Sequence, residues 1–233
     1  MTSPKIYVYT DFDGTITQKD LLYHLLDVAA PPEWRAIEDA LTAEEIDERT
    51  ALQQEFALLS ISLEEAIPII LDVPIDPHFK SFAMFCQEHN IPLEILSGGF
   101  DQFIRAYLTK HGLDFVPFHS NSARVENNRW QIIGSPNPKI RNLCNHCKTY
   151  WLQQRIQQGY TIVYIGDGNT DRCPATHAHY RFAKGDLAAY LQKYNYSFIP
   201  FSSFADVLSE FQQLINRLKE NNRVSSLTNP SHR

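Results

Sequence analysis

The amino-acid sequence predicts an α/β protein in which a doubly wound parallel sheet carries a small inserted helical domain. From about residue 77 onward, β-branched and aromatic runs alternate with helical hydrophobic patterns, as in sheets built from strand–helix–strand units. Before that point, a helical block follows directly on the first strand and interrupts the alternation. We therefore expect a core formed by residues 1–16 and 76–233 and a helical cap formed by residues 17–75.

The expected strands are short apolar runs bounded by turn residues, and three of them end in polar turns that contain glycine. Asn127 and Asn128 are the expected turn of a hairpin over residues 123–133. The other strands are expected over residues 5–10, 91–96, 115–118, 161–165 and 180–183.

Helices are expected where apolar residues recur at intervals of three and four. In the cap, the leucines at positions 21, 22, 25 and 26 begin this pattern, and residues 33–60 are expected to form one or two further helices. Gly112 is the expected C-terminal cap of a core helix. The core helices are expected over residues 79–90, 100–111, 145–158 and 204–218.

Composition limits the classes of function. The chain has 233 residues, of which 43% are hydrophobic, so it can bury a core without disulfides. Its 21 basic and 27 acidic residues give a net charge of −6, which is not the basic footprint of a nucleic-acid or membrane-surface binder. The N-terminus shows no export signal and the cysteines number four, so we expect a protein of the reducing cytoplasm with no membrane partner.

Acidic and small polar residues follow three of the expected strands. Asp11 and Asp13 follow the first, Ser97 follows the second, and Asp167 and Asp171 follow the third. In open parallel sheets, ligands bind at the carboxyl ends of the strands. Carboxylates gathered there repel one another unless a cation is present, and oxygen ligands favour Mg²⁺. The sequence therefore predicts a magnesium site at this edge of the sheet.

These residue types also suit phosphoryl transfer. Asp11 would attack phosphorus, since carboxylates are established nucleophiles in this chemistry. Asp13 would protonate the leaving oxygen and then activate water. The Ser97 hydroxyl and the Gly98 N–H would hold the phosphoryl oxygens. The lysine that offsets the phosphoryl charge stays open among Lys139, Lys148 and Lys184.

Four motifs resemble, in their order, those of the haloacid dehalogenase superfamily of phosphatases: Asp-Phe-Asp-Gly-Thr at residues 11–15, the Ser97 turn, a later lysine, and Gly-Asp-Gly-x-x-Asp at residues 166–171. The helical insert between the first two motifs is similar to the C1-type cap of the phosphoserine phosphatase branch. The resemblance implies a Rossmann-like core and catalysis through an aspartyl-phosphate.

The same resemblance implies a role for each matched residue. Asp11 is then the nucleophile and Asp13 the general acid and base. Magnesium is then held by the Asp11 carboxylate, the Asp13 carbonyl and Asp167, and Asp171 supports this shell. Lys148 is then the lysine that binds the phosphoryl group with Ser97 and Gly98, because residues 144–148 resemble the Cys-x-x-Cys-Lys segment of one sub-branch.

That sub-branch contains the methionine-salvage phosphatase of 2-hydroxy-3-keto-5-methylthiopentenyl-1-phosphate, and the resemblance implies a phosphomonoesterase for a small phosphorylated metabolite. One alternative is a phosphatase for phosphoserine, phosphoethanolamine or phosphocholine. An alternative from another class is a phospho-aspartate switch or binding protein. Receiver domains of that class are about half this length and need no second acid, so Asp13 favours an enzyme.

Other residues keep two interpretations. Asp20 lies where phosphoserine phosphatases carry a substrate-selecting Glu, but it is also suited to the first turn of a helix. Arg49 would line the cap or pair with Glu45 four residues earlier. Cys144 and Cys147 lack the second ligand pair of a zinc site, so small turn residues are favoured over a metal or redox pair.

Overall fold

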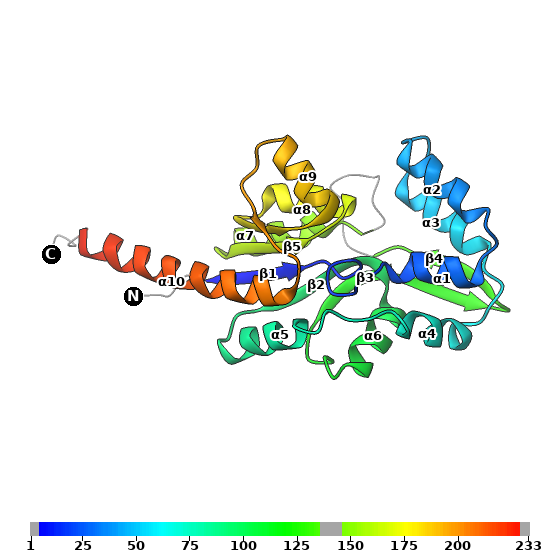
Figure 1. Cartoon of the computed structure of the whole chain (residues 1–233), viewed down its shortest axis with the longest axis horizontal. Coiled ribbons are helices and arrows are strands. Elements are labelled where there is room, and N and C mark those ends of the chain that lie inside the picture. Colours follow the sequence, from blue (N-terminus) through cyan, green and yellow to red (C-terminus); the bar gives the residue numbers. More distant parts are fainter. Residues whose placement is uncertain (1–4, 136–145, 229–233) are drawn as a thin grey trace. The chain divides into compact units, whose positions relative to one another are not determined.

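Figure 1 shows a computed structural model of the chain, which describes residues 5–135 and 146–228. Within these residues, seven strands form one sheet in the order β4-β3-β2-β1-β5-β6-β7. The pairs β2–β3, β5–β6 and β6–β7 are parallel, and β3–β4 is antiparallel. The predicted α/β fold is therefore confirmed. The strands are β1 Ile6–Thr10, β2 Leu93–Phe100, β3 Phe118–Glu126, β4 Arg129–Ile133, β5 Thr161–Gly166, β6 Tyr180–Ala183 and β7 Ile199–Pro200.

The helices of the described part of the chain begin where the hydrophobic pattern changes from alternation to helical spacing. A short 3₁₀ helix, η1, covers Asn169–Asp171. The α-helices are α1 Leu21–Ala29, α2 Trp34–Thr42, α3 Glu48–Ala57, α4 Leu63–Leu71, α5 Phe79–Glu88, α6 Asp101–Lys110, α7 Lys148–Gln157, α8 Arg172–His177, α9 Gly185–Lys193 and α10 Phe204–Thr228.

The chain divides into two compact units by the contacts of its Cα atoms. The first unit comprises Met1–Tyr9, Pro77–Leu93 and Leu152–Arg233, and the second comprises Thr10–Asp76 and Glu94–Trp151. The predicted cap, residues 17–75, lies within the second unit. The boundaries of core and cap at residues 16 and 76 stay a prediction.

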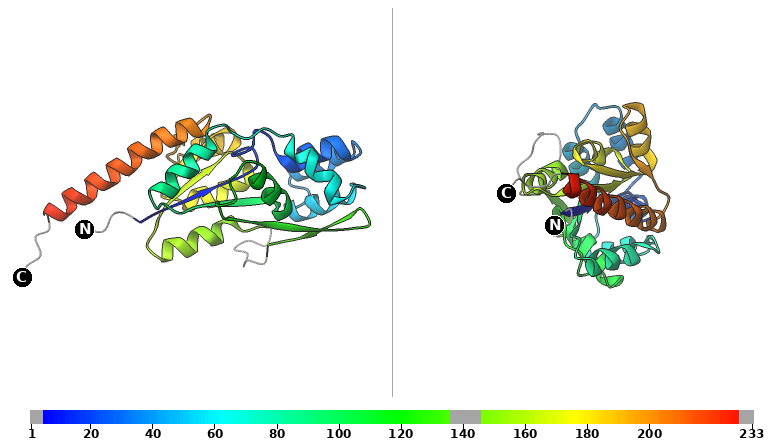
Figure 2. Two further views of the ribbon diagram at one scale, coloured as in Figure 1. Left: turned by 90° about the horizontal axis from the view of Figure 1, so that it is seen from below. Right: turned by 90° about the vertical axis from the view of Figure 1, so that its left-hand side faces the viewer.

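An aromatic cluster joins two helices of the first unit. Phe82 of α5 lies with its ring centroid 5.4 Å from that of Phe204 and 5.5 Å from that of Phe211, both on α10. All three side chains are fully buried. Figure 2 shows α10 running along α5 and continuing past it. The apolar stripe over residues 204–218 correctly predicted this helix, which extends to Thr228.

A second aromatic cluster lies in the second unit. The ring of Phe56, on α3, lies 4.8 Å from Phe100 and 5.6 Å from Trp130 of β4, between ring centroids. Trp130 also donates its indole N–H to the carbonyl of Ile61 at 2.9 Å. These contacts fix α3 against the β3–β4 hairpin, which Figure 1 shows in green.

Side-chain caps define the starts of three helices in the second unit. The Asp20 carboxylate accepts the N–H groups of Leu22 and Tyr23 at the start of α1, and Asp47 accepts the N–H of Thr50 in α3. At α4, Ser62 and Glu65 form a reciprocal capping box. Such caps satisfy amide groups that the first helical turn leaves without partners.

Two strand predictions are wrong in their limits. The strand expected to end at residue 96 continues through Ser97, and its pairing with β3 shifts register between Leu96 and Phe100. Residues 115–117 are not a strand, since β3 begins at Phe118. A register shift depends on the partner strand, so neither limit was available from local pattern.

The hairpin prediction is confirmed. Strands β3 and β4 pair from Glu126–Arg129 outward, and the turn residues between them are Asn127 and Asn128. Both have positive φ angles, 49° and 58°. A two-residue turn of this type matches the right-handed twist of the strands, and asparagine tolerates the conformation well.

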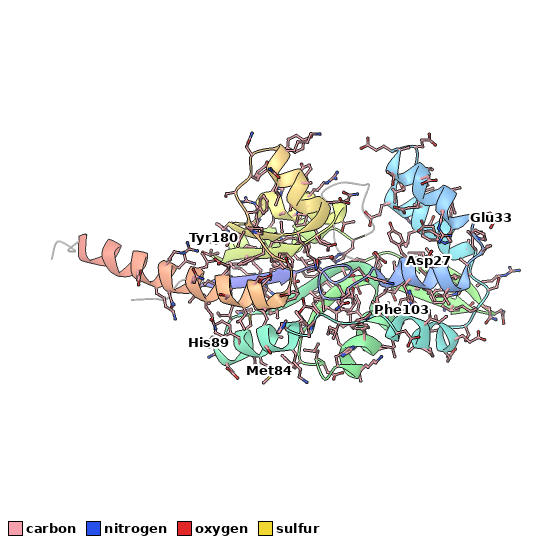
Figure 3. The ribbon with its side chains drawn as sticks, in the orientation of Figure 1. Asp27, Glu33, Met84, His89, Phe103 and Tyr180 are labelled. Carbon is pink, nitrogen blue, oxygen red and sulfur yellow. The ribbon has the colours of Figure 1, made fainter. Side chains whose placement is uncertain are left out.

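The buried face of α5 supplies a test of the first unit. We expect Phe82→Ala to lower the free energy of unfolding by about 3–5 kcal/mol, because a fully buried ring is lost from the cluster with Phe204 and Phe211. Met84, labelled in Figure 3, is 44% exposed on the same helix, so Met84→Ala serves as the matched control with a change within about 0.5 kcal/mol. Urea unfolding measures both, and equal losses would contradict this packing.

Candidate active site

A buried ion pair lies beyond the end of β1 in the second unit. The Lys148 ammonium, at the first residue of α7, donates to the Asp11 carboxylate at 2.6 Å. Lys148 is 4% exposed and Asp11 is 5% exposed. Because both charged groups are withdrawn from water, each needs the opposite charge in close contact to offset the lost hydration. Asp11 is therefore held ionised beside a cation, as a carboxylate that attacks an anionic phosphoryl group must be.

Among the candidate lysines, Lys148 lies beside Asp11 within the second unit. Lys184 belongs to the first unit, at the N-terminal end of α9, with its ammonium 5.2 Å from the ring centroid of Phe201. Lys139 lies outside the described residues.

Asp13 lies against the strand-end serine. The Ser97 hydroxyl donates to Asp13 Oδ2 at 3.2 Å and accepts the N–H of Gly99 at 2.9 Å. The N–H of Leu21 donates to the other Asp13 oxygen at 3.0 Å. Burial, and then the negative charge of Asp20, raise the pKa of Asp13 to about 8. A carboxyl that keeps its proton near neutral pH is suited to act as a general acid.

The backbone around Gly98 is held by residues that the motif search did not find. The Asn121 side chain, 1% exposed on β3, donates to the Gly98 carbonyl at 2.7 Å and accepts the N–H of Ser135 at 3.0 Å. From α3, a carboxylate oxygen of Glu48 lies 3.7 Å from where a Cβ on Gly98 would stand. Neither residue belongs to a local motif, and strand pairing and helix packing bring them there.

In the first unit, the turn after β5 folds around Asp171. One oxygen of this fully buried carboxylate accepts the Tyr164 hydroxyl at 2.6 Å. The other accepts the N–H groups of Asp167 and Gly168 at 3.0 and 3.1 Å. The Asp171 carboxylate thereby fixes the backbone that presents Asp167, whose own side chain is half-buried.

The same turn explains one glycine of the motif. A Cβ on Gly166 would lie 2.5 Å from Asp171 Oδ2 and 2.7 Å from its Cγ. Those separations are far below van der Waals contact, so only glycine fits. At Gly168 nothing lies within 4 Å of a Cβ, so that position tolerates a side chain.

Asp20 caps α1 through the amides of Leu22 and Tyr23, at 2.7 and 3.0 Å. The helix-start interpretation is therefore confirmed, and the selector role stays a prediction. Burial and, more weakly, the charge of Glu38 raise the pKa of Asp20. Asp20 in turn raises the pKa of Asp13, so the cap residue and the candidate acid are electrostatically linked.

Arg49 is exposed near the start of α3. Glu45 precedes that helix, so the expected helical i, i+4 pair between them is wrong. A role for Arg49 in lining the cap stays a prediction.

The cysteines take no part in a metal-ligating group of the described residues. Cys144 lies outside those residues, and Cys147 is buried. Next to it, the buried His146 accepts the indole N–H of Trp151 at 3.3 Å. Burial lowers the pKa of His146 to about 3, so this imidazole stays neutral.

Comparison with known proteins gives the family. The profile of the haloacid dehalogenase-like hydrolases matches residues 8–175, which include Asp11, Lys148 and Asp171. The chain belongs to this family.

None of the helices in residues 5–135 and 146–228 combines the length and hydropathy that a membrane span requires.

Curated relatives make this haloacid dehalogenase-like hydrolase a phosphatase. It is 32% identical over 216 residues to a protein of Brevibacillus brevis named 2-hydroxy-3-keto-5-methylthiopentenyl-1-phosphate phosphatase, covering 91% of this chain and 97% of the relative. A protein of the same name from Geobacillus thermodenitrificans is also 32% identical, over 90% of this chain and 97% of the relative.

Solved structures agree with the fold. A phospho-aspartyl intermediate analogue of phosphoserine phosphatase has a TM-score of 0.68 at 17% identity, covering 89% of this chain and 99% of that one. A substrate-bound phosphoserine phosphatase has a TM-score of 0.66, also at 17% identity, over 90% and 99%. At such low identity the likeness shows that this hydrolase shares their fold.

The two glycines beside Asp167 supply a matched test. We expect Gly166→Ala to lower the free energy of unfolding by about 1–3 kcal/mol, because the new methyl group overpacks the Asp171 carboxylate. Gly168→Ala meets open space and would change it by less than about 1 kcal/mol. Urea unfolding of both variants measures the difference, and equal effects would show that Asp171 is not held against Gly166.

Proposed function

We propose that this phosphatase is a Mg²⁺-dependent phosphomonoesterase that works through a phosphoryl group on Asp11, and that its substrate is 2-hydroxy-3-keto-5-methylthiopentenyl-1-phosphate. The single observation that carries the mechanism is the buried Asp11–Lys148 pair beside a protonatable Asp13. The substrate is supported by the names of the curated relatives, which match about nine-tenths of the chain.

In the first half-reaction, an Asp11 carboxylate oxygen would attack phosphorus and form the P–O bond of the aspartyl-phosphate. The ester P–O bond would break, and Asp13 would give its proton to the leaving oxygen. The Lys148 ammonium, already beside Asp11, would hold a phosphoryl oxygen with the Ser97 hydroxyl and the Gly98 N–H. The raised pKa of Asp13 supports this assignment, since the step needs a protonated acid.

In the second half-reaction, Asp13 would act as a base, because it has lost its proton to the leaving alcohol. It would take a proton from water as the water oxygen attacks phosphorus. The bond between phosphorus and Asp11 would then break, and inorganic phosphate would leave. Asp13 regains its proton and Asp11 its charge, so both residues return to their starting states.

The donor set fits a hard divalent cation. Asp11 of the second unit and Asp167 and Asp171 of the first each offer a carboxylate oxygen, and these are the side chains that would hold the ion. With the Asp13 carbonyl, they are oxygen ligands of the kind Mg²⁺ prefers. The bound ion would offset negative charge on the transferring phosphoryl group. Since Asp171 already accepts three hydrogen bonds, we assign it the role of orienting Asp167.

Two Asp11 variants test the nucleophile. We expect Asp11→Asn and Asp11→Glu each to lower kcat at least about a thousandfold, because the first removes the nucleophile and the second displaces it by one methylene. Asp11→Glu keeps a charge opposite Lys148, so it separates loss of chemistry from loss of the ion pair. Asp27→Asn, at an exposed acid, is the matched control with normal turnover.

Phosphate release and circular dichroism are measured on all three proteins. A folded Asp11→Glu or Asp11→Asn protein with ordinary turnover would show that another group accepts phosphorus.

A panel of phosphate esters tests the substrate. We expect the highest kcat/KM for the methylthiopentenyl ester, and lower values for phosphoserine, phosphoethanolamine and phosphocholine. EDTA should abolish every rate and added Mg²⁺ should restore it. A clear preference for the amine-bearing esters would replace the proposed substrate. If EDTA leaves the hydrolysis rates unchanged, the proposed role of Mg²⁺ is wrong.

A further inference from the structure

Two carboxyl groups in the second unit each keep one buried oxygen atom without a hydrogen-bond partner. Glu55, on α3, is 3% exposed, and its Oε1 atom has no hydrogen-bond partner. Glu38, on the neighbouring helix α2, is half-buried, and its buried Oε2 atom also has none. A buried oxygen without a hydrogen-bond partner lowers the stability of the fold by about 1–3 kcal/mol. Two such oxygens close together therefore need an explanation.

An unpaired donor accompanies these acceptors. Trp34 stands one turn before Glu38 on the same face of α2, is 6% exposed, and has an indole N–H without a partner. Its ring stacks on Tyr23 of α1 at 5.7 Å between centroids. A buried donor and two buried acceptors without partners, gathered from neighbouring helices, could be satisfied by polar groups of a bound molecule.

The charges that act on Glu55 are negative, whereas the guanidinium of Arg35 lies 4.9 Å from the ring centroid of Trp34. Glu38 faces Glu55 from α2, and Asp20 and Tyr23 face it from α1. The charge of Asp20 also acts on Asp13. The strand packed against α3, β4, directs Trp130 toward Phe56, and its Arg129 is exposed. Lys148, whose charge acts on Asp20, is held by Asp11.

Two carboxylates that share a buried site cannot both stay ionised without a cation. Burial, repulsion from Glu38 and Asp20, and a carboxyl–carboxyl hydrogen bond to Glu38 raise the pKa of Glu55 to about 7. Near neutral pH Glu55 therefore holds a proton part of the time, and the protonated form gives the pair an O–H group to donate.

We propose that the Glu38–Glu55 pair, together with the Trp34 indole, donates hydrogen bonds to an oxygen of the substrate's leaving group. The site would then take phosphate esters whose alcohol carries a carbonyl or enol oxygen, rather than esters that carry an ammonium group. This inference rests on the proposed phosphatase function and names the residues that would recognise the leaving group of its substrate. It gives a role to two helices of the predicted cap.

The proposal requires the bound proton, so its test compares a permanent donor with an ionisable one. Glu55→Gln keeps an N–H donor at every pH, Glu55→Ala removes the group, and Glu45→Gln changes an exposed acid just before the same helix. The probes are dihydroxyacetone phosphate, which carries a carbonyl, phosphoethanolamine, which carries an ammonium, and propyl phosphate, which carries neither. KM and kcat are measured with Mg²⁺ at about pH 6 and about pH 8.5.

For dihydroxyacetone phosphate, we expect the wild-type KM to rise about three- to tenfold between the two pH values, as the pair loses its proton. Glu55→Gln should remove this rise, while Glu55→Ala should have the higher KM at both pH values. Glu45→Gln should follow the wild type. Propyl phosphate should show no such pH dependence of KM in any of the four proteins.

The opposite pattern would overturn the proposal. If the pair binds cations as carboxylates, KM for phosphoethanolamine falls as pH rises, and Glu55→Gln abolishes that fall. A KM for dihydroxyacetone phosphate that follows the same pH course in wild type and Glu55→Gln would also refute it. If no ester is hydrolysed by the wild type in the presence of Mg²⁺, the proposed function itself fails.

The shared proton has a second readout that needs no substrate. Between the ordinary pKa of a glutamate and about 7, folded Glu55 holds a proton that the unfolded chain has released. Stability therefore falls as pH rises through this range. We expect the urea midpoint of the wild type to fall more between about pH 5 and about pH 8 than that of Glu55→Gln. Equal falls would mean that Glu55 is ionised throughout, which contradicts the proposal.

Discussion

The buried ion pair between Asp11 and Lys148 is the interaction on which the candidate active site depends. It joins residues 137 positions apart at 2.6 Å, with both charges withdrawn from water. A lone charge at either position would be strongly destabilising, because it would lose hydration without gaining a partner. The start of α7 is therefore tied to the turn after β1. The same pair keeps the carboxylate ionised and the ammonium close to where a phosphoryl group would be transferred.

The acidic side chains of the second unit lie in two different electrostatic environments. At Asp11 a cation compensates the carboxylate, whereas Asp13, Asp20 and Glu55 have raised pKa values because burial and mutual repulsion oppose ionisation. The unit therefore places a carboxylate paired with a cation beside carboxyl groups whose pKa values are raised. This difference in environment separates a nucleophile from an acid, although both roles are filled by the same type of side chain.

Much of the fold could be predicted because it follows from local patterns. The alternation of strands and helices, the Asn127–Asn128 turn and the stripe of α10 each depend on residues close in sequence. Helix α4 falls within the predicted helical cap but was not separately predicted, and Pro68 in its interior is unusual for a helix. Its Ser62–Glu65 capping box was a local signal that would have identified it.

The parts of the site that escaped prediction depend on tertiary structure. Asn121 reaches the Gly98 carbonyl across paired strands whose register shifts, and Glu55 meets Glu38 through helix packing. The Gly-Asp-Gly motif at residues 166–168 shows what a sequence pattern leaves undetermined. Its pattern marks a turn, but only the structure distinguishes Gly166, where a methyl group would strike Asp171, from Gly168, where it would meet nothing. A motif thus identifies which residues matter, whereas the distances determine why each one does.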